Sequence, residues 1–220
     1  VGIDVDCLPV LDVPVPGSHD VIGDRAYGET PEIVAALGKA AMEGALAGGV
    51  LPIIKHIPGH GRAGVNSHEK LPVVDTDRAT LSATDFPPFS ELSDAPLAMT
   101  AHVIYSAIDR DNPATNSPTV ISEIIRSEIG FSGVLMSDDL SMKALAGSFE
   151  ERTRASLAAG CDLVLHCNGD MDEMQAVATE APALTGSALD RTERALQMRT
   201  DPERVDLEHL IHRFSSLVSL

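Results

Sequence analysis

The sequence contains no tryptophan, and only 3% of its 220 residues are aromatic. It therefore has few flat side chains on which nucleic-acid bases could stack. Basic residues are also scarce, because 16 Lys and Arg stand against 33 Asp and Glu and give a net charge of −17. A charge of this size and sign repels polyanions. We expect neither a nucleic-acid-binding protein nor one that binds acidic lipid surfaces.

The sequence also lacks long hydrophobic runs, and none approaches the roughly 20 apolar residues that a transmembrane helix needs. No basic stretch followed by an apolar one opens it, so no secretion signal is predicted. Cysteine occurs three times, without CxxC or zinc-finger spacing. We interpret the cysteines as reduced thiols and expect a cytoplasmic protein that is not bound to a membrane.

The hydrophobic content is sufficient for a folded core, at 44% of the residues and a mean hydropathy of +0.06. A chain of this length can bury such a core within one domain. We expect a single domain over residues 1–220, with helices from about residue 170 to the C-terminal end.

Five short apolar segments alternate with amphipathic, helix-like segments along the chain. Helix starts are marked by Thr30 with Pro31, by Ser117 with Pro118, and by a capping-box pattern that begins at Ser148. The alternation predicts parallel βαβ units, built either as an open doubly wound sheet or as a (β/α)8 barrel. The predicted strands cover residues 3–12, 51–57, 97–103, 133–138 and 162–167.

Polar residues of functional types stand at the C-terminal end of every predicted strand. A barrel collects such strand ends at one face, so the pattern favours the (β/α)8 TIM-type barrel. No GxGxxG or Walker lysine loop supports a nucleotide-binding alternative. A closed barrel takes about 250 residues and eight strands, so we expect an incomplete barrel. The strand-end residues are Asp12, Lys55, His56, His102, Asp138, Asp139 and His166.

The densest group of chemically active side chains is KHIPGHGRAGVNSH, residues 55–68. It runs from a strand end into a loop with three glycines and three histidines. Glycine lets a backbone approach a ligand, and histidine exchanges protons near neutral pH. The alternative is a polar loop whose histidines bond its own backbone. Pro58 and Gly59 disfavour a helical metal site between His56 and His60, and we expect no metal or other cofactor.

A second group, MSDDLSM at residues 136–142, places two adjacent carboxylates at the end of a buried strand. Asp138 is placed to react, whereas Asp139 could cap a following helix. Arg25 could either clamp a polar substrate or pair with a neighbouring carboxylate. His102 is a further substrate-binding candidate, although a histidine after an apolar strand is often a buried structural group.

The KHIPGHG loop, the Ser67-His68 pair and MSDDLSM resemble glycoside hydrolase family 3, and within it the cytosolic β-N-acetylglucosaminidase branch. The segments PVLDV (9–13), GDR (23–25), MTAHV (99–103) and AGCD (159–162) are similar to that branch as well. The similarity runs through most of the chain, and the loop together with the SDD motif is highly specific.

The resemblance implies a barrel enzyme that removes terminal, non-reducing β-linked N-acetylglucosamine, in this branch from muropeptide fragments of recycled cell wall. It implies a retaining reaction in which Asp138 is the nucleophile and His68 is the acid/base. It further implies that Lys55, His56 and Arg25 hold sugar hydroxyls.

Two features depart from the family pattern. The family has Asp-Ser-His where this chain has Asn66, Ser67 and His68. Asn66 can hydrogen-bond an imidazole but cannot neutralise its charged form, so we expect slower turnover. The family's Asp-Gln-Glu-Gly-Gly-Arg stretch has no match in this chain. We therefore expect the first barrel units to be missing and this chain alone to be inactive.

Three alternatives remain open on the sequence. The chain could be a family 3 β-glycosidase of other sugar preference or a phosphorylase, because a neutral histidine tolerates phosphate as the acceptor. It could be a catalytically impaired sugar-binding barrel, as Asn66 suggests. It could be a metal-dependent hydrolase, which a chelator would inhibit. The sequence indicates no particular oligomeric state.

Overall fold

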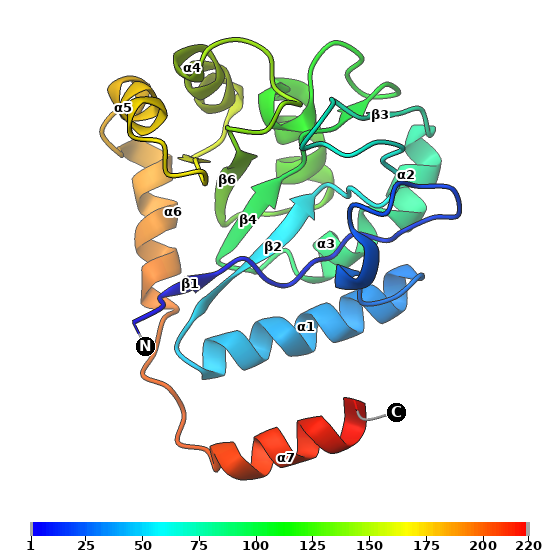
Figure 1. Cartoon of the computed structure of the whole chain (residues 1–220), viewed down its shortest axis with the longest axis vertical. Helices are drawn as coiled ribbons and strands as arrows, with labels where there is room; N and C mark the ends of the chain where they lie inside the picture. Colours follow the sequence, from blue (N-terminus) through cyan, green and yellow to red (C-terminus); the bar gives the residue numbers. More distant parts are fainter. Residues whose placement is uncertain (1, 219–220) are drawn as a thin grey trace.

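The computed structural model describes residues 2–218 and contains one main sheet of five parallel strands (Figure 1). The order of these strands in the sheet follows their order in the chain, which confirms the predicted parallel α/β fold. Their C-terminal ends consequently meet at one edge, where functional side chains of such folds gather. The strands are β1 (Val5–Asp6), β2 (Leu51–Ile57), β4 (Leu97–Thr100), β6 (Val134–Asp139) and β7 (Leu163–Leu165).

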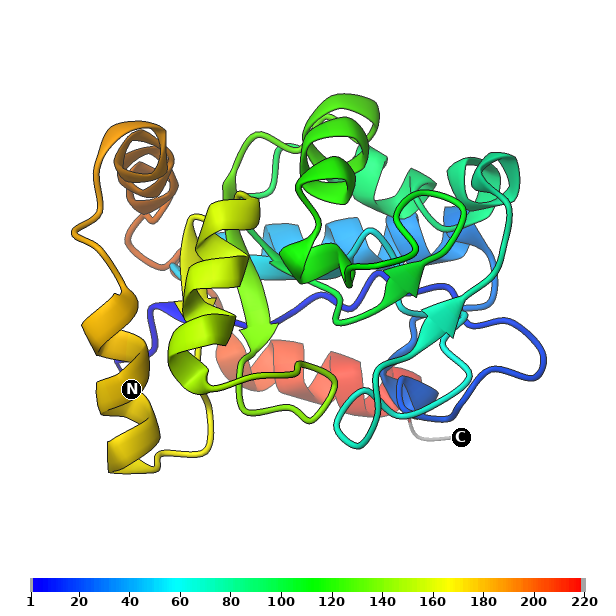
Figure 2. The same ribbon diagram turned by 90° about the horizontal axis from the view of Figure 1, so that it is seen from above.

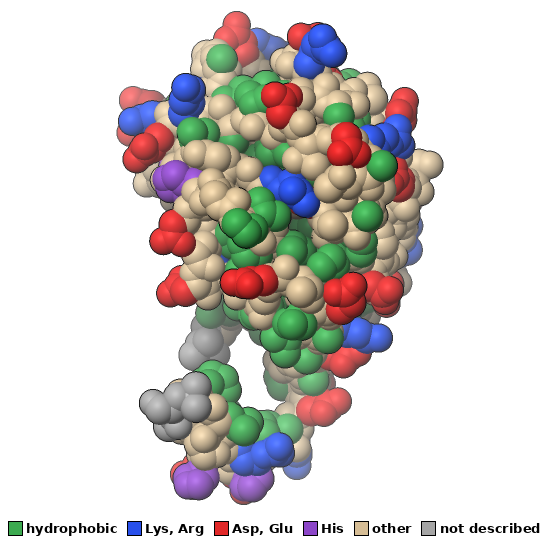
Figure 3. Space-filling view, turned by 90° about the vertical axis from the view of Figure 1, so that its right-hand side faces the viewer, with side chains coloured by type: hydrophobic (Ala, Val, Ile, Leu, Met, Phe, Trp, Pro, Cys, Tyr) green, Lys and Arg blue, Asp and Glu red, His purple; other side chains and the backbone are tan. Residues whose placement is uncertain are grey.

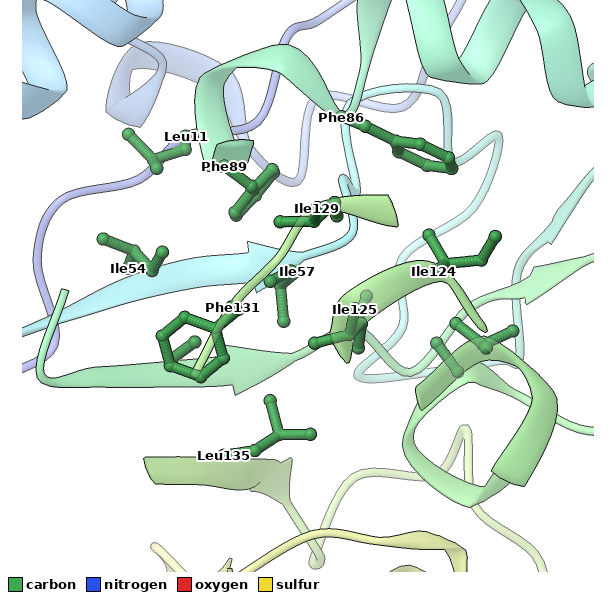
Figure 4. Close-up of a cluster of buried hydrophobic side chains, with 14 of the residues drawn as sticks. Leu11, Ile54, Ile57, Phe86, Phe89, Ile124, Ile125, Ile129, Phe131 and Leu135 are labelled. Atoms are coloured by element: carbon green, nitrogen blue, oxygen red, sulfur yellow. The ribbon is translucent and has the colours of Figure 1, made fainter. Parts of the chain in front are cut away.

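The larger hydrophobic core lies between the sheet and the helices that cover one of its faces (Figure 4). Ile54 and Leu135 enter it from strands, and Phe89 and Ile125 enter it from helices. Burial of each such side chain is worth about 1.5–3 kcal/mol. The helices are α1 (Pro31–Ala47), α2 (Arg78–Thr84), α3 (Pro87–Glu91), the π-helical η3 (Val120–Glu128) and α4 (Phe149–Ala159).

The opposite face of the sheet carries a smaller core, which includes Ile53, Met99 and Met136. Side chains alternate between the two faces because successive strand residues point to opposite sides. Helix α6 (Gly186–Gln197) contacts this second core through Ala195. Within residues 2–218 the sheet stays open, with β1 and β7 as its edges, so the expectation of an incomplete barrel is confirmed.

Local sequence signals placed the helix starts correctly. Thr30 caps α1 by accepting a hydrogen bond from the backbone N of Ile33 at 3.5 Å. Ser148 and Glu151 form the predicted capping box of α4. Gly160 ends α4 with a φ of +117°, a left-handed conformation that glycine adopts without a steric penalty.

The first strand is shorter than predicted. Only β1 forms a regular ladder, although the chain continues beside β2 as far as Leu11, whose backbone N donates to Lys55 O at 2.7 Å. Pro9 has no N–H to donate and interrupts the ladder there. The pair β3 (Val73–Val74) and β5 (Ile104–Tyr105) was not predicted, and neither were α2 and α3, because elements of two to seven residues carry little periodicity.

Three helices make up the C-terminal part of the described chain: α5 (Met171–Glu180), α6 and α7 (Leu207–Val218). Helices α5 and α6 lie at one end of the molecule and α2 lies at the other (Figure 2). Helix α7 stands apart from the main body, and its residues are exposed (Figure 3). Among residues 2–218, no helix is both long enough and apolar enough to cross a membrane.

Candidate active site

A pocket of about 210 Å³ opens at the C-terminal ends of β2 and β6. A larger hollow of about 760 Å³ lies near the start of the chain and residues 199–202, but it holds none of the predicted site residues. The smaller pocket is therefore the candidate site. Its polar lining consists of Arg25, Lys55, His56, His60, Ser67, His68, Asp138 and Asp139. Its other lining residues are Val21, Ile22, Met99, Met142 and Cys167.

Five of the seven site residues predicted from the sequence line this pocket together. They come from four separate parts of the chain, and the parallel sheet brings these parts to one place. Asn66 and His102 are not among the lining residues. The five residues that line the pocket are Arg25, Lys55, His56, His68 and Asp138.

The end of β2 delivers two consecutive residues to the pocket. The pairing of β2 with β4 shifts register between Lys55 and Ile57. Such an irregularity re-aims side chains that would otherwise alternate between faces. Lys55 and His56 consequently both line the pocket. His56 is 7% exposed, and its Nδ1 lies 2.7 Å from Asp12 Oδ2.

Asp12 and His60 are parts of this site to which the sequence analysis gave no role. Asp12 is fully buried and accepts hydrogen bonds from the backbone N of His56 at 3.2 Å and of His60 at 2.6 Å. Burial raises the pKa of Asp12, but the opposing effects of His56 and His60 outweigh it, so the pKa is lowered overall. The only sign of a role for Asp12 in the sequence is its position at the end of the apolar stretch PVL. Its partners could not be predicted, because they lie more than 40 residues away.

Asp138 at the end of β6 is held as an anion. Burial raises its pKa, and electrostatic interactions with the His56 and His102 rings, together with the backbone N–H of Asp139, lower it further than burial raises it. That N–H donates to Asp138 Oδ1 at 2.8 Å. The net effect is a lowered pKa, so the carboxylate is ionised at neutral pH, as a nucleophile must be.

The neighbouring Asp139 has a different task. Its side chain accepts hydrogen bonds from the backbone N of Ser141 and of Cys167, each at 3.0 Å. It therefore caps the turn after β6 and ties that turn to the chain that follows β7. The two adjacent carboxylates thus divide as the sequence analysis allowed, with one structural and the other free to react.

His68 lies on a loop that is fastened at several points. Ser67 Oγ lies 3.1 Å from His60 Nε2, and Arg62 Nε donates to Asp85 Oδ2 at 2.7 Å. Asn66 Oδ1 accepts from the backbone N of His68 at 2.9 Å. Asn66 thus orders the backbone of the loop, and within residues 2–218 its amide forms no hydrogen bond with the His68 imidazole, a bond that the sequence left open.

His102 requires a second correction. It is fully buried, its Nδ1 lies 2.7 Å from Thr115 Oγ1, and its Nε2 lies 3.1 Å from the carbonyl oxygen of Asp139. A carbonyl only accepts, so Nε2 carries the proton. Both ring nitrogens are occupied and the ring is outside the pocket lining, so His102 supports the end of β6 through Asp139 instead of contacting a substrate. Burial lowers its pKa.

Arg25 belongs to η1 (Gly23–Arg25) and reaches the pocket rim. Its Nη2 donates to the carbonyl oxygen of Val21 at 2.6 Å. Within residues 2–218 Arg25 forms no ion pair, so the structure does not show the alternative in which its guanidinium pairs with a neighbouring carboxylate. The guanidinium retains donors for a ligand. In the same described range, no group of three or more His, Cys, Asp and Glu side chains is arranged to hold a metal ion.

Acid should destabilise the fold through His60. Burial is the main cause that lowers its pKa to about 4, whereas an unfolded histidine titrates at about 6.5. The stability contributed by neutral His60 is fully present above that unfolded value and is lost as the pH falls from there towards the folded one. The difference is worth up to about 3 kcal/mol. Urea unfolding at a series of pH values should therefore show a weaker pH dependence in His60→Gln than in the parent protein.

His212→Gln is the matched control, because this histidine lies on the exposed helix α7. It should retain the full pH dependence. Equal slopes for the parent and His60→Gln between pH 4 and 6.5 would show that His60 is not held neutral.

Comparison with known proteins gives the class of the chain. Residues 1–197 match the glycosyl hydrolase family 3 N-terminal domain. The chain belongs to glycoside hydrolase family 3. A β-hexosaminidase of Chromobacterium violaceum is 41% identical over 197 residues, which are 88% of this chain and 55% of that protein. A β-hexosaminidase of Idiomarina loihiensis is 38% identical over 213 residues, which are 96% of this chain and 63% of that protein. The chain thus spans little more than half the length of these relatives.

Solved structures agree with the family. A family 3 β-N-acetylglucosaminidase from a Paenibacillus species superposes with a TM-score of 0.85 at 31% identity, over 97% of this chain and 46% of that one. NagZ from Neisseria gonorrhoeae superposes with a TM-score of 0.78 at 34% identity, over 99% of this chain and 61% of that one. The same NagZ has been solved with N-trifluoroacetyl-D-glucosamine, with a TM-score of 0.79 at 34% identity over the same shares of the two chains.

Proposed function

We propose that the protein is a retaining β-N-acetylhexosaminidase that removes terminal, non-reducing β-linked N-acetylglucosamine. The observation that carries the proposal is the shared pocket of Asp138 and His68, an anionic carboxylate and a histidine on a separate loop. The β-hexosaminidase names of the relatives and the N-acylglucosamine bound by NagZ support the same substrate class.

In the first step, an Asp138 oxygen attacks the anomeric carbon while His68 donates a proton to the glycosidic oxygen. The bond from that carbon to the leaving group breaks, and a glycosyl ester forms on Asp138. In the second step, His68 takes a proton from water, and the resulting hydroxide displaces Asp138 from the same carbon. Two displacements restore the β configuration, as in other retaining glycosidases.

Charge explains why a histidine suits this site. Retaining enzymes usually use two carboxyl groups about 5–5.5 Å apart, which repel each other when both are ionised. A neutral imidazole does not repel the Asp138 anion, and histidine serves as both acid and base near pH 7. Lys55, His56 and Arg25 line the same pocket and supply donors for sugar hydroxyls.

We further propose that the substrates are muropeptide fragments of peptidoglycan and that the protein acts in cell-wall recycling in the cytoplasm. Support for this finer statement comes from the resemblance of the KHIPGHG and SDD motifs to the cytosolic branch of the family. A substrate competition test addresses it. Muropeptides that carry terminal N-acetylglucosamine should be cleaved with higher kcat/KM than chitobiose.

The central experiment is incubation with an aryl β-N-acetylglucosaminide, which also tests the expectation that residues 1–220 alone are inactive. Release of β-N-acetylglucosamine would support hydrolysis, whereas a sugar phosphate formed only when phosphate is added would identify a phosphorylase. A 2-fluoro glycosyl fluoride should label Asp138 covalently in an enzyme and leave a sugar-binding protein unlabelled. A chelator should not change the rate, because the proposed steps involve only protein side chains.

Asn66→Asp should raise turnover. The introduced carboxylate can keep the hydrogen bond that Asn66 Oδ1 accepts from His68 N, and its charge stabilises the protonated imidazole. We expect an increase of about 10- to 100-fold in kcat, the size typical of partners that orient and tune a functional histidine. Steady-state kinetics on an aryl glycoside measure it.

Asn112→Asp is the charge-matched control for that variant, because Asn112 is exposed and bonds Asp109 outside the pocket. It should leave kcat unchanged. Unchanged or lower turnover in Asn66→Asp would count against an acid/base role for His68.

A further inference from the structure

Asp12 lies behind the wall of the pocket and not in it. The side chain is fully buried and is absent from the pocket lining. It follows the segment that runs beside β2, and the neighbouring Leu11 is fixed there by the hydrogen bond from its N to Lys55 O. Ionised carboxylates are rarely buried unless they are paired or fully hydrogen-bonded, so the contacts of Asp12 indicate what it is for.

Both carboxylate oxygens are used, and they serve the two segments that carry the pocket's histidines. Oδ2 lies 2.7 Å from His56 Nδ1. Oδ1 accepts from the backbone N of His56 at 3.2 Å and of His60 at 2.6 Å. Because the pKa of Asp12 is lowered, it is ionised and can only accept. The hydrogen between Asp12 and His56 must therefore reside on Nδ1.

The same contacts determine what His56 presents to a ligand. His56 lines the pocket, and within residues 2–218 its Nε2 forms no hydrogen bond. With one proton fixed on Nδ1, Nε2 is the ring nitrogen left for a ligand, and it is an acceptor when the ring carries that proton alone. His60 lies beside it with ring centroids 5.6 Å apart. Its Nε2 in turn contacts Ser67, the residue before His68.

We propose that Asp12 is a positioning residue that fixes His56 in the Nδ1–H form, so that Nε2 accepts a hydrogen bond from a sugar hydroxyl, and that holds the start of the His68 loop through His60. This inference rests on the proposed function. Asp12 then affects substrate binding and turnover without contacting the substrate.

The most direct test needs no substrate. Nitrogen-15 NMR of histidine side chains in the parent protein distinguishes a protonated Nδ1 from a protonated Nε2, and His56→Gln identifies the signals of that ring. We expect Nδ1 of His56 to carry the proton. A neutral ring with its proton on Nε2 would overturn the proposal even if the protein has no glycosidase activity.

Asp12→Asn tests the consequence for turnover. The amide can place its NH2 against Nδ1, so that Nδ1 becomes the acceptor. The ring then takes the other tautomer, in which Nε2 carries the proton and donates. Partners that orient a functional histidine typically contribute about 10- to 100-fold. We expect a loss of about that size in kcat/KM on an aryl β-N-acetylglucosaminide, together with a reversed NMR signature. In the His56→Gln background, Asp12→Asn should lower kcat/KM much less, because the imidazole that Asp12 positions is absent.

Asp162→Asn is the matched control. Asp162 is also buried and also bonds a backbone N–H, that of Leu135 at 2.9 Å, but outside the pocket. It should lower stability without changing the His56 ring. Equal losses from Asp12→Asn in the parent and His56→Gln backgrounds would show that Asp12 acts on the fold alone and would overturn the proposal. If the parent lacks activity altogether, the NMR result still decides the tautomer, and only the proposed function fails.

Discussion

Asp138→Ala is expected to abolish turnover of aryl β-N-acetylglucosaminides, with a loss of about 10⁴- to 10⁶-fold in kcat. Removal of a nucleophile from a group of residues that act together produces effects of this order. The structure gives the reason, because Asp138 lines the pocket and only its Oδ1 accepts a hydrogen bond within residues 2–218, which leaves Oδ2 to react, whereas the carboxylate of Asp139 holds the following turn. Steady-state kinetics and mass spectrometry after incubation with a 2-fluoro glycosyl fluoride measure the loss of turnover and of covalent labelling.

Azide distinguishes loss of the nucleophile from loss of the fold. The shortened side chain of Asp138→Ala leaves space in which azide can attack the anomeric carbon of an activated substrate from the side that Asp138 occupied. A single displacement inverts the configuration, so an α-glycosyl azide should accumulate. Asp94→Ala, at an exposed position outside the pocket, should behave as the parent protein in the same assay. Labelling that persists in Asp138→Ala would instead assign the nucleophile to Asp139.

Features that depend on neighbouring residues could be predicted from the sequence. Thr30 and Ser148 mark helix starts because each bonds a backbone N–H within three residues. The apolar runs of β2 and β6 identified buried parallel strands, and the ends of these strands supplied Lys55, His56 and Asp138. A parallel sheet must place those ends together, so this part of the pocket followed from strand order alone.

Features that depend on distant pairings could not be predicted in this way. Asp12 and His56 are 44 residues apart, and nothing in the sequence shows which carboxylate meets which ring. His102 illustrates the reverse error, since a strand-end histidine has the same local pattern whether it faces a ligand or bonds Thr115 outside the pocket lining. The side chain of Asn66 accepts from the backbone N–H of His68, two residues away. Composition does not show whether such a side chain bonds the backbone or the imidazole.

His68→Ala should separate substrates by their leaving groups. General acid catalysis contributes about 10²- to 10⁴-fold where the departing oxygen needs a proton. Disaccharides and other substrates with alkoxide leaving groups should lose activity by that factor. Aryl glycosides with strongly acidic phenols depart without protonation, so their glycosylation step should slow by about 10-fold or less. Rates for a series of phenols should consequently become steeply dependent on phenol acidity in the variant and remain shallow in the parent.

Because His68 is exposed at the pocket, this result would reflect loss of its proton transfer and not a change in the fold. Truncation of an exposed loop side chain leaves the core and the Asp138 environment in place, so covalent labelling of Asp138 by an activated fluoride should continue. Hydrolysis of that labelled form should slow, because the same imidazole activates water in the second step, and added azide should restore its release. His209→Ala on α7 provides the control without effect. If His68→Ala lowers the rates of good and poor leaving groups equally, then the proton comes from another group, and the pairing of Asp138 with His68 is wrong.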